Sequence, residues 1–177
     1  MRKEVFIHLS FLFTFFILMH LAKGWFSFSF YPLWIGGILG TFLPDIDHLL
    51  YVYLIKPEEL NSLRIKELIS KRKFASTIKA LFEGRRARGE LIFHTVLFQL
   101  LFLVLTFLII TSSGSIFGRG LVLGLGLHLL VDQLVDFLDL GSLENWFRQF
   151  PLVVDRQKDI LYWVGNVIVL LFFAFFL

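Results

Sequence analysis

Residues 5–22 read VFIHLSFLFTFFILMHLA, an almost unbroken apolar run. A helix needs about 20 such residues to cross the hydrocarbon core of a bilayer. Comparable runs follow at 32–55, 91–110, 116–138 and 160–177. The basic start of the chain is similar to the first part of a signal peptide, but the run is long and lacks a small-x-small cleavage site, so we expect a retained helix. The sequence predicts an all-α, polytopic membrane bundle of about five spans, with residues 1–177 forming one membrane domain.

The composition supports this class. Of the 177 residues, 57% are hydrophobic and 18% are charged, whereas an ordinary soluble domain has about 25% charged residues. The chain has no Cys, which excludes disulfides, thiolate metal sites and cysteine nucleophiles. The net charge of +3 is explained by one basic loop, so we expect the lipid bilayer, and no nucleic acid, as a partner.

The distribution of Lys and Arg predicts the orientation, because cytoplasmic loops of membrane proteins carry an excess of both. With the N-terminus inside, segments 1–4, 56–90 and 139–159 are cytoplasmic and hold 2, 10 and 3 basic residues. The outer segments hold only Lys23 and Arg119. We therefore expect an integral protein of the plasma (inner) membrane with a cytoplasmic N-terminus and an outer C-terminus.

Residues 56–90 form the one long polar stretch of the sequence. Apolar residues recur in it at roughly helical spacing, with Lys and Arg between them: Leu60, Leu63, Ile65, Leu68, Ile69, Phe74, Ile78, Leu81 and Phe82. This pattern is typical of amphipathic helices that lie on an anionic leaflet. An ordinary basic cytoplasmic loop is the alternative, and it explains the charge equally well.

Ionisable side chains inside the runs are the most informative feature, since each costs roughly 2.5–3.5 kcal/mol at the centre of a membrane helix. They are His8 in the first run, Asp45, Asp47 and His48 in the second, His94 in the third, and His128, Asp132 and Asp136 in the fourth. Four unpaired Asp would cost on the order of 10 kcal/mol, comparable to the stability of a whole domain. Protons, arginines reaching in from a loop, or a bound metal cation must therefore neutralise them.

The positions of these ionisable residues along the apolar runs suggest that their side chains lie close together in the folded protein. Helices rise about 1.5 Å per residue, which places the ionisable residues of four runs at a similar level near the cytoplasmic side, whereas His20 falls near the opposite end. His128 and Asp132 are four residues apart and share a helix face. Pro44 loosens the second run, and irregular backbone at membrane depth is tolerated where it lines a cavity.

Glycines predict which runs touch. Gly-x-x-x-Gly spacing occurs at Gly36 and Gly40 in the second run and at Gly120 and Gly124 in the fourth. Small residues at this spacing let two helix backbones approach closely in a membrane. We therefore expect the second and fourth spans to be in contact.

Imidazole nitrogens and carboxylate oxygens without thiolates suit zinc, manganese, iron or magnesium, and several imidazoles favour zinc or another transition metal. The candidate ligands are His8, Asp45, His48, His94, His128 and Asp132. Asp47 or Asp136, if not a ligand, is the candidate general base. Arg86 and Arg88 precede the third run and are expected at the cytoplasmic mouth of the site, where they are candidates to bind a substrate phosphate.

Three blocks of the sequence, in this order, resemble those of a known family: Leu43–His48 (Leu-Pro-Asp-Ile-Asp-His), His94-Thr95, and Gly126-Leu127-His128 with Asp132. They are similar to the YdjM-like family of membrane-bound metal-dependent hydrolases. His8 matches the early His of that family by position. The resemblance covers roughly residues 5–140 and implies metal-dependent hydrolysis. A site open to the inner leaflet favours a phospholipid or phosphoester substrate.

Two other functions remain open. Asp and His inside a membrane also form proton or metal-ion pathways. In a transporter, polar residues should continue to the outer face, but the outer halves of spans two to four are apolar or Gly apart from Thr41, Thr106 and Thr111–Ser113. The sequence therefore favours a one-sided hydrolase site over a transporter. A non-catalytic membrane protein with a structural metal is the third alternative.

Overall fold

The computed structural model describes residues 2–83, 90–150 and 155–177, and in these ranges the protein is helical, without a strand. Four stretches are long and apolar enough to cross a membrane: Glu4–Lys23, Phe28–Ile55, Ile116–Leu140 and Arg156–Phe176. A shorter apolar helix, Val96–Ser112, corresponds to the predicted third span. The structure confirms the all-α bundle. Among the helices that correspond to expected spans, Val96–Ser112 is shorter than the four long apolar stretches.

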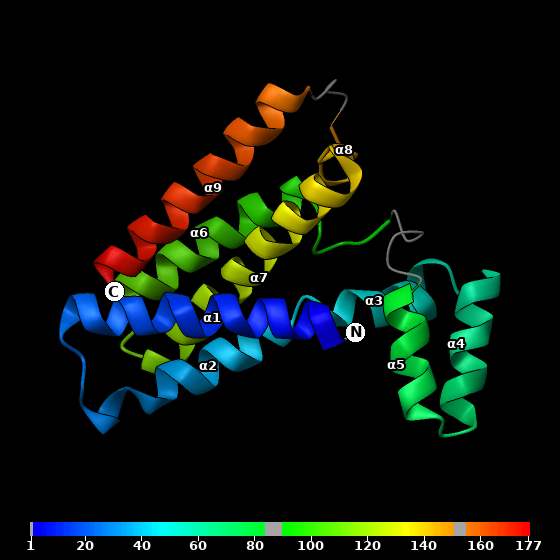
Figure 1. Ribbon diagram of the computed structural model, residues 1–177, viewed down its shortest axis with the longest axis horizontal. Coiled ribbons are helices and arrows are strands. Elements are labelled where there is room, and N and C mark those ends of the chain that lie inside the picture. The colour runs from blue at the N-terminus through cyan, green and yellow to red at the C-terminus, as the bar shows by residue number, and fades with distance from the viewer. Residues whose placement is uncertain (1, 84–89, 151–154) are drawn as a thin grey trace.

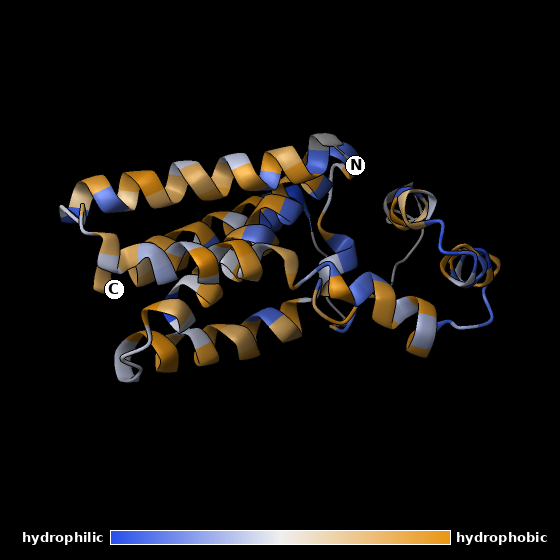
Figure 2. Cartoon of the chain, turned by 90° about the horizontal axis from the view of Figure 1, so that it is seen from below, coloured by the Kyte–Doolittle hydropathy of each residue, from blue (hydrophilic) through white to orange (hydrophobic). Residues whose placement is uncertain are grey.

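In chain order the elements are α1 (Arg2–Lys23), η1 (Phe28–Phe30), α2 (Tyr31–Phe42), α3 (Ile46–Leu50), η2 (Tyr51–Ile55), α4 (Leu60–Ser70), α5 (Phe74–Glu83), α6 (Val96–Ser112), α7 (Ile116–Leu140), α8 (Glu144–Phe147) and α9 (Arg156–Phe176). Figure 1 shows α1, α2, α6, α7 and α9 as a bundle with the two chain ends at opposite ends of it. Figure 2 shows that the bundle helices are mostly hydrophobic, while hydrophilic residues gather toward the end that carries the N-terminus.

The closest helix contact joins α2 and α7. A Cβ added to Gly36 would come within 2.1 Å of a backbone oxygen of α7, and one added to Gly124 within 2.1 Å of the carbonyl oxygen of Gly37. Gly40 and Gly120 lie as close to the opposite backbone. Only glycine permits this approach, so the predicted contact of the second and fourth spans is confirmed. The contact fixes α7, with its His and Asp residues, against the second span.

The second span is broken at the predicted place. α2 ends at Phe42, a turn follows, and α3 begins at Ile46. Pro44 accounts for the break, because it lacks the N–H that a helix needs at this position and its ring would clash with the carbonyl of Gly40 in a continuous helix. The chain continues through α3 into η2, a π-helical turn of a kind that is frequent at functional sites. Asp47 and His48 are buried just after the break.

α6 begins later than the sequence predicts. The apolar run starts at Leu91, but the helix starts at Val96, after Thr95 has capped it by accepting a hydrogen bond from the Phe98 N–H at 3.2 Å. The expectation that His94 lies inside the third span is therefore wrong, because His94 belongs to a non-helical segment in front of it. The backbone N–H groups of that segment need partners other than a helix.

The described part of residues 56–90 contains two helices, as its periodicity predicts. α4 and α5 form a hairpin at the end of the bundle near the N-terminus, and both lie across the direction of α1 (Figure 1). Ile65 of α4 and Ala80 of α5 pack with Val52 of η2 in a small core of their own. This core attaches the hairpin to the second span.

Candidate metal centre

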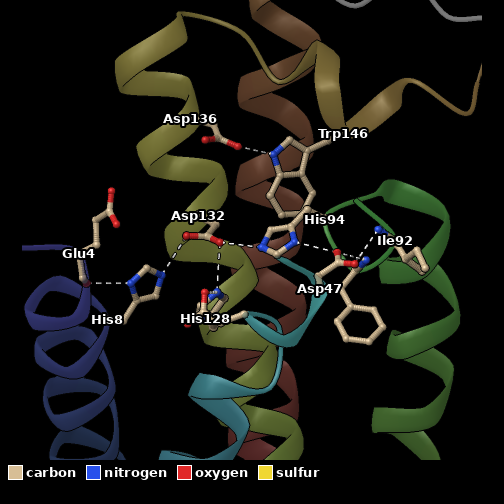
Figure 3. A network of polar contacts seen from close by, with 11 residues as sticks. Glu4, His8, Asp47, Ile92, His94, His128, Asp132, Asp136 and Trp146 are labelled. Atoms are coloured by element: carbon tan, nitrogen blue, oxygen red, sulfur yellow. Dashed lines mark hydrogen bonds and ion pairs between the residues drawn. The ribbon is translucent and has the colours of Figure 1, made fainter. Parts of the chain in front are cut away.

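Asp132 of α7 is the centre of a buried polar network (Figure 3). One carboxylate oxygen, Oδ1, lies 3.0 Å from Nε2 of His8, which comes from α1. The other, Oδ2, lies 2.9 Å from Nε2 of His94 and 3.1 Å from Nε2 of His128, one turn earlier on α7. Asp132 is fully buried, and each histidine is 8% exposed or less. Residues from three separate segments therefore direct three imidazole nitrogens at one carboxylate.

In His8 and His94, the contact made by Nδ1 decides whether Nε2 carries a proton. Nδ1–H of His8 donates to the backbone oxygen of Glu4 at 2.9 Å, and Nδ1–H of His94 donates to Oδ2 of Asp47 at 3.2 Å. A neutral imidazole carries one N–H, so both Nε2 atoms then present lone pairs to the oxygens of Asp132. Two acceptors at about 3 Å repel each other unless additional protons or a cation lie between them.

His20 provides a contrast within the same chain. Its Nδ1–H donates to the backbone oxygen of Phe16 at 2.8 Å, and its Nε2 accepts a hydrogen bond from Nε1–H of Trp34 at 3.3 Å. A neutral imidazole satisfies both contacts. The structure thus agrees with the expectation that His20, unlike His8, lies outside the polar centre.

Asp47 holds His94 in place. Its carboxylate accepts the backbone N–H of Ile92 at 3.0 Å and of Phe93 at 2.6 Å, in addition to the bond from His94. These N–H groups are available because α6 starts only at Val96. Asp47 lies behind His94 in the way that a carboxylate often lies behind a metal-ligating histidine, an arrangement that raises the basicity of the imidazole. This geometry argues against the predicted role of Asp47 as a general base.

Asp136 also has a positioning contact. Its Oδ2 accepts a hydrogen bond from Nε1–H of Trp146 at 2.9 Å (Figure 3). The Trp146 ring is 1% exposed and lies edge-on to the His94 ring, with 5.6 Å between centroids. Asp136 therefore anchors an aromatic cover over the centre, which is a different role from the predicted general base.

The remaining predicted ligands lie at the margin. Oδ1 of Asp45 is 4.0 Å from Nε2 of His128, and its side chain is 31% exposed. The ring of His48 is buried and stacks on that of His94, with centroids 5.7 Å apart. Arg86 and Arg88 lie outside the described residues, so their predicted contact with substrate stays a prediction.

A narrow crevice between α1, α2 and α7 opens onto the centre. His8, Asp45 and His128 line it together with Glu4, Val5, Leu9, Thr41 and Phe42. Its volume of about 10 Å³ is close to that needed by one water molecule. Oε2 of Glu4 is buried and has no hydrogen-bond partner among the described residues. Sequence reasoning missed Glu4, although its position one helical turn before His8 was a usable signal.

A second polar group, of amide and phenol side chains, lies beside the first. Oε1 of Gln99 accepts hydrogen bonds from Nε2 of Gln133, at 2.6 Å, and from the hydroxyl of Tyr162. Gln133 directly follows Asp132, so the group borders the centre on the side of α6 and α9. Asn166, 8% exposed, lies one turn beyond Tyr162. Sequence reasoning missed this group, because uncharged residues did not stand out within the apolar runs.

The donor set is able to hold a metal ion. One ligand atom each from His8, His128 and Asp132 lies within 4.8 Å of the other two, and all three residues are buried. Two ligands bound tetrahedrally to zinc at 2.0–2.1 Å are about 3.3 Å apart, so the observed Nε2–oxygen distances of 2.9 to 3.1 Å need little change. No family model, curated protein or solved structure matches this chain.

Proposed function

We propose that this protein is a membrane-bound, metal-dependent hydrolase whose centre lies toward the cytoplasmic leaflet. The observation that carries the proposal is the buried carboxylate of Asp132, whose oxygens lie 3.0 Å from Nε2 of His8 and 3.1 Å from Nε2 of His128. A cation held by Asp132 with His8 and His128, whose ligand atoms lie within 4.8 Å of one another, neutralises the buried carboxylate. The motifs that contain His94, His128 and Asp132 are also those that resemble the YdjM-like hydrolases.

We infer zinc as the most suitable metal. Two imidazole nitrogens, of His8 and His128, and one carboxylate, of Asp132, lie close enough to share one ion, and the chain has no thiolate. Catalytic zinc sites use three protein ligands with a fourth position left open. Manganese and iron accept the same donors, whereas magnesium prefers oxygen ligands. The carbonyl behind His8 and the carboxylate behind His94 are partners that metal-ligating histidines usually have.

The crevice supplies the remaining requirements of hydrolysis. A bound zinc ion lowers the pKa of water and polarises the bond to be cleaved. In the crevice, the carboxylates of Glu4 and Asp45 border a space of about one water molecule next to His8 and His128. Since Asp47 is engaged by backbone N–H groups, Glu4 and Asp45 are better placed to accept a proton from that water.

The position of the crevice indicates the substrate class. Val5, Leu9 and Phe42 border it on the lipid-facing helices, close to the polar end of α1. If the N-terminus is cytoplasmic, as the basic residues predict, a bond at head-group level of the inner leaflet would lie at this depth. We therefore propose a phospholipid or another phosphoester with an apolar part as the substrate.

A transport function has less support. A pathway needs polar groups through the outer half of the membrane. Asn166 and Thr106 line a second, separate cavity, and most of the other residues around it, such as Leu170 and Phe173, are apolar. The polar region is therefore one-sided, as in a hydrolase that works on one leaflet.

A screen of phosphoesters and phospholipids, with and without chelator, tests the proposal. The zinc-loaded protein should release phosphate, an alcohol or a fatty acid from at least one of them, and chelation should abolish this release. His128→Ala should lower the metal content and the rate, and Asp45→Ala, which removes a candidate proton acceptor, should lower the rate. His20→Ala, which removes a satisfied histidine at the other end of α1, should change neither. A metal-loaded protein that cleaves no substrate in the screen would instead favour a structural metal.

A further inference from the structure

The α4–α5 hairpin leaves an apolar face uncovered by the described part of the chain. On α5, Phe74 is 65% exposed and Ile78 is 42% exposed. They are four residues apart and lie on one side of the helix. Thr77 and Ala80, on a neighbouring side, are buried. One side of α5 therefore attaches the helix, and a second, apolar side stays open.

The hairpin has a defined position relative to the spans. Ile65 and Ala80 pack on Val52, and Nζ of Lys66 donates to the backbone oxygen of Pro57 at 2.9 Å. Both helices lie across the end of the bundle (Figure 1), and in the turned view of Figure 2 they are seen nearly end-on while α1 runs lengthwise. Since α1 is long and apolar enough to cross a membrane, α4 and α5, which lie across its direction, would run roughly parallel to the membrane surface.

Cations border the apolar face. Residues 60–83 contain six basic and two acidic side chains, which gives a net charge of +4. Three of the basic residues, Lys71, Arg72 and Lys73, form the exposed turn immediately before Phe74. A surface-parallel helix with an apolar side next to Lys and Arg is the arrangement that binds the interface of anionic membranes.

We propose that the α4–α5 hairpin rests on the anionic lipid leaflet at the end of the bundle that holds the metal centre. Phe74 and Ile78 contact the acyl boundary, and the cations of the turn contact head-group phosphates. A lipid surface fits better than a nucleic acid or an acidic protein segment, because it alone offers an apolar layer directly beneath a layer of negative charge. The proposal is independent of whether the metal centre is catalytic.

Nitroxide labels on single cysteines test it, since the natural chain has no Cys. One label replaces Phe74, and the matched control replaces Ser76, which is also exposed but lies about 200° around the helix. The proteins are placed in nanodiscs of phosphatidylcholine alone or with about one third phosphatidylglycerol. The measured quantity is the ratio of label collisions with oxygen, which concentrates in lipid, to collisions with a water-soluble nickel complex.

In discs with phosphatidylglycerol, the ratio at Phe74→Cys should exceed that at Ser76→Cys at least about threefold. It should fall toward the control value in pure phosphatidylcholine, and also when Lys71, Arg72 and Lys73 are all replaced by Gln. Equal ratios at the two positions in anionic discs overturn the proposal and leave the face to a protein partner. A high ratio that depends neither on phosphatidylglycerol nor on the three cations overturns the requirement for anionic lipid.

Discussion

Replacement of Asp47 by Asn should weaken zinc binding about 10- to 100-fold while the bundle stays folded. The carboxylate accepts three N–H groups, from Ile92, Phe93 and His94, and it carries the negative charge behind the His94 ring. An Asn side chain has one acceptor oxygen and places an NH₂ group against at least one of these donors. Loss of one hydrogen bond to a charged group is worth about 1.5–3 kcal/mol, and the expected loss of affinity corresponds to about 1.4–2.8 kcal/mol.

Competition for zinc with a chromophoric chelator, on detergent-solubilised protein, measures this effect. The control is Asp155→Asn, which alters an exposed carboxylate that caps α9 by accepting the Lys158 N–H at 2.9 Å. Asn caps a helix as well as Asp does, so this variant should bind zinc like the wild type. If Asp47→Asn keeps a helical circular dichroism spectrum and a zinc dissociation constant within about twofold of the wild type, His94 is not a ligand supported by Asp47.

Three other predictions concern the same architecture. Zinc affinity should fall at least about tenfold from pH 7.5 to 5.5, because protons compete for the imidazole nitrogens, and an affinity independent of pH would exclude histidine ligands. Gly124→Ala should lower the thermal unfolding midpoint markedly, since the added Cβ would lie 2.1 Å from the Gly37 carbonyl oxygen. Gly165→Ala, which has open space around it, should leave the midpoint unchanged. Equal midpoints for the two variants would contradict the close contact of α2 and α7. In sealed vesicles, an impermeant thiol reagent should reach Lys73→Cys only from the cytoplasmic side and Ser113→Cys only from the outer side, and the opposite pattern would reverse the predicted orientation.

Local signals in the sequence predicted much of the fold. Apolar runs located the spans, Pro44 located the break in the second span, and glycines at 36/40 and 120/124 located the closest helix contact. Depth along the helices also predicted that His8 and Asp132 would meet, although 124 residues separate them in the chain. Each of these features follows from helical rise, helical period or one residue's own backbone chemistry.

The roles of the carboxylates could not be read in the same way. Asp47 and Asp136 look like free acids in the sequence, but the first is engaged by a backbone segment 45 residues away and the second by Trp146. The first contact depends on where α6 begins. Thr95 caps the helix and sets this start, which cannot be located from the apolar run alone because the run begins earlier, at Leu91. Glu4 was missed because it follows two basic residues and precedes the apolar run, although it lies one helical turn before His8 and lines the same crevice.

Zinc-edge X-ray absorption of the reloaded protein tests the shared metal most directly. Bound zinc should have nitrogen and oxygen neighbours at about 2.0–2.1 Å, with the multiple scattering of at least two imidazole rings. His8→Ala should remove one ring from this signal, and His20→Ala should leave the spectrum unchanged. A folded wild-type protein that takes up no zinc, or whose spectrum is the same with and without His8, would contradict a metal held between the histidines and Asp132.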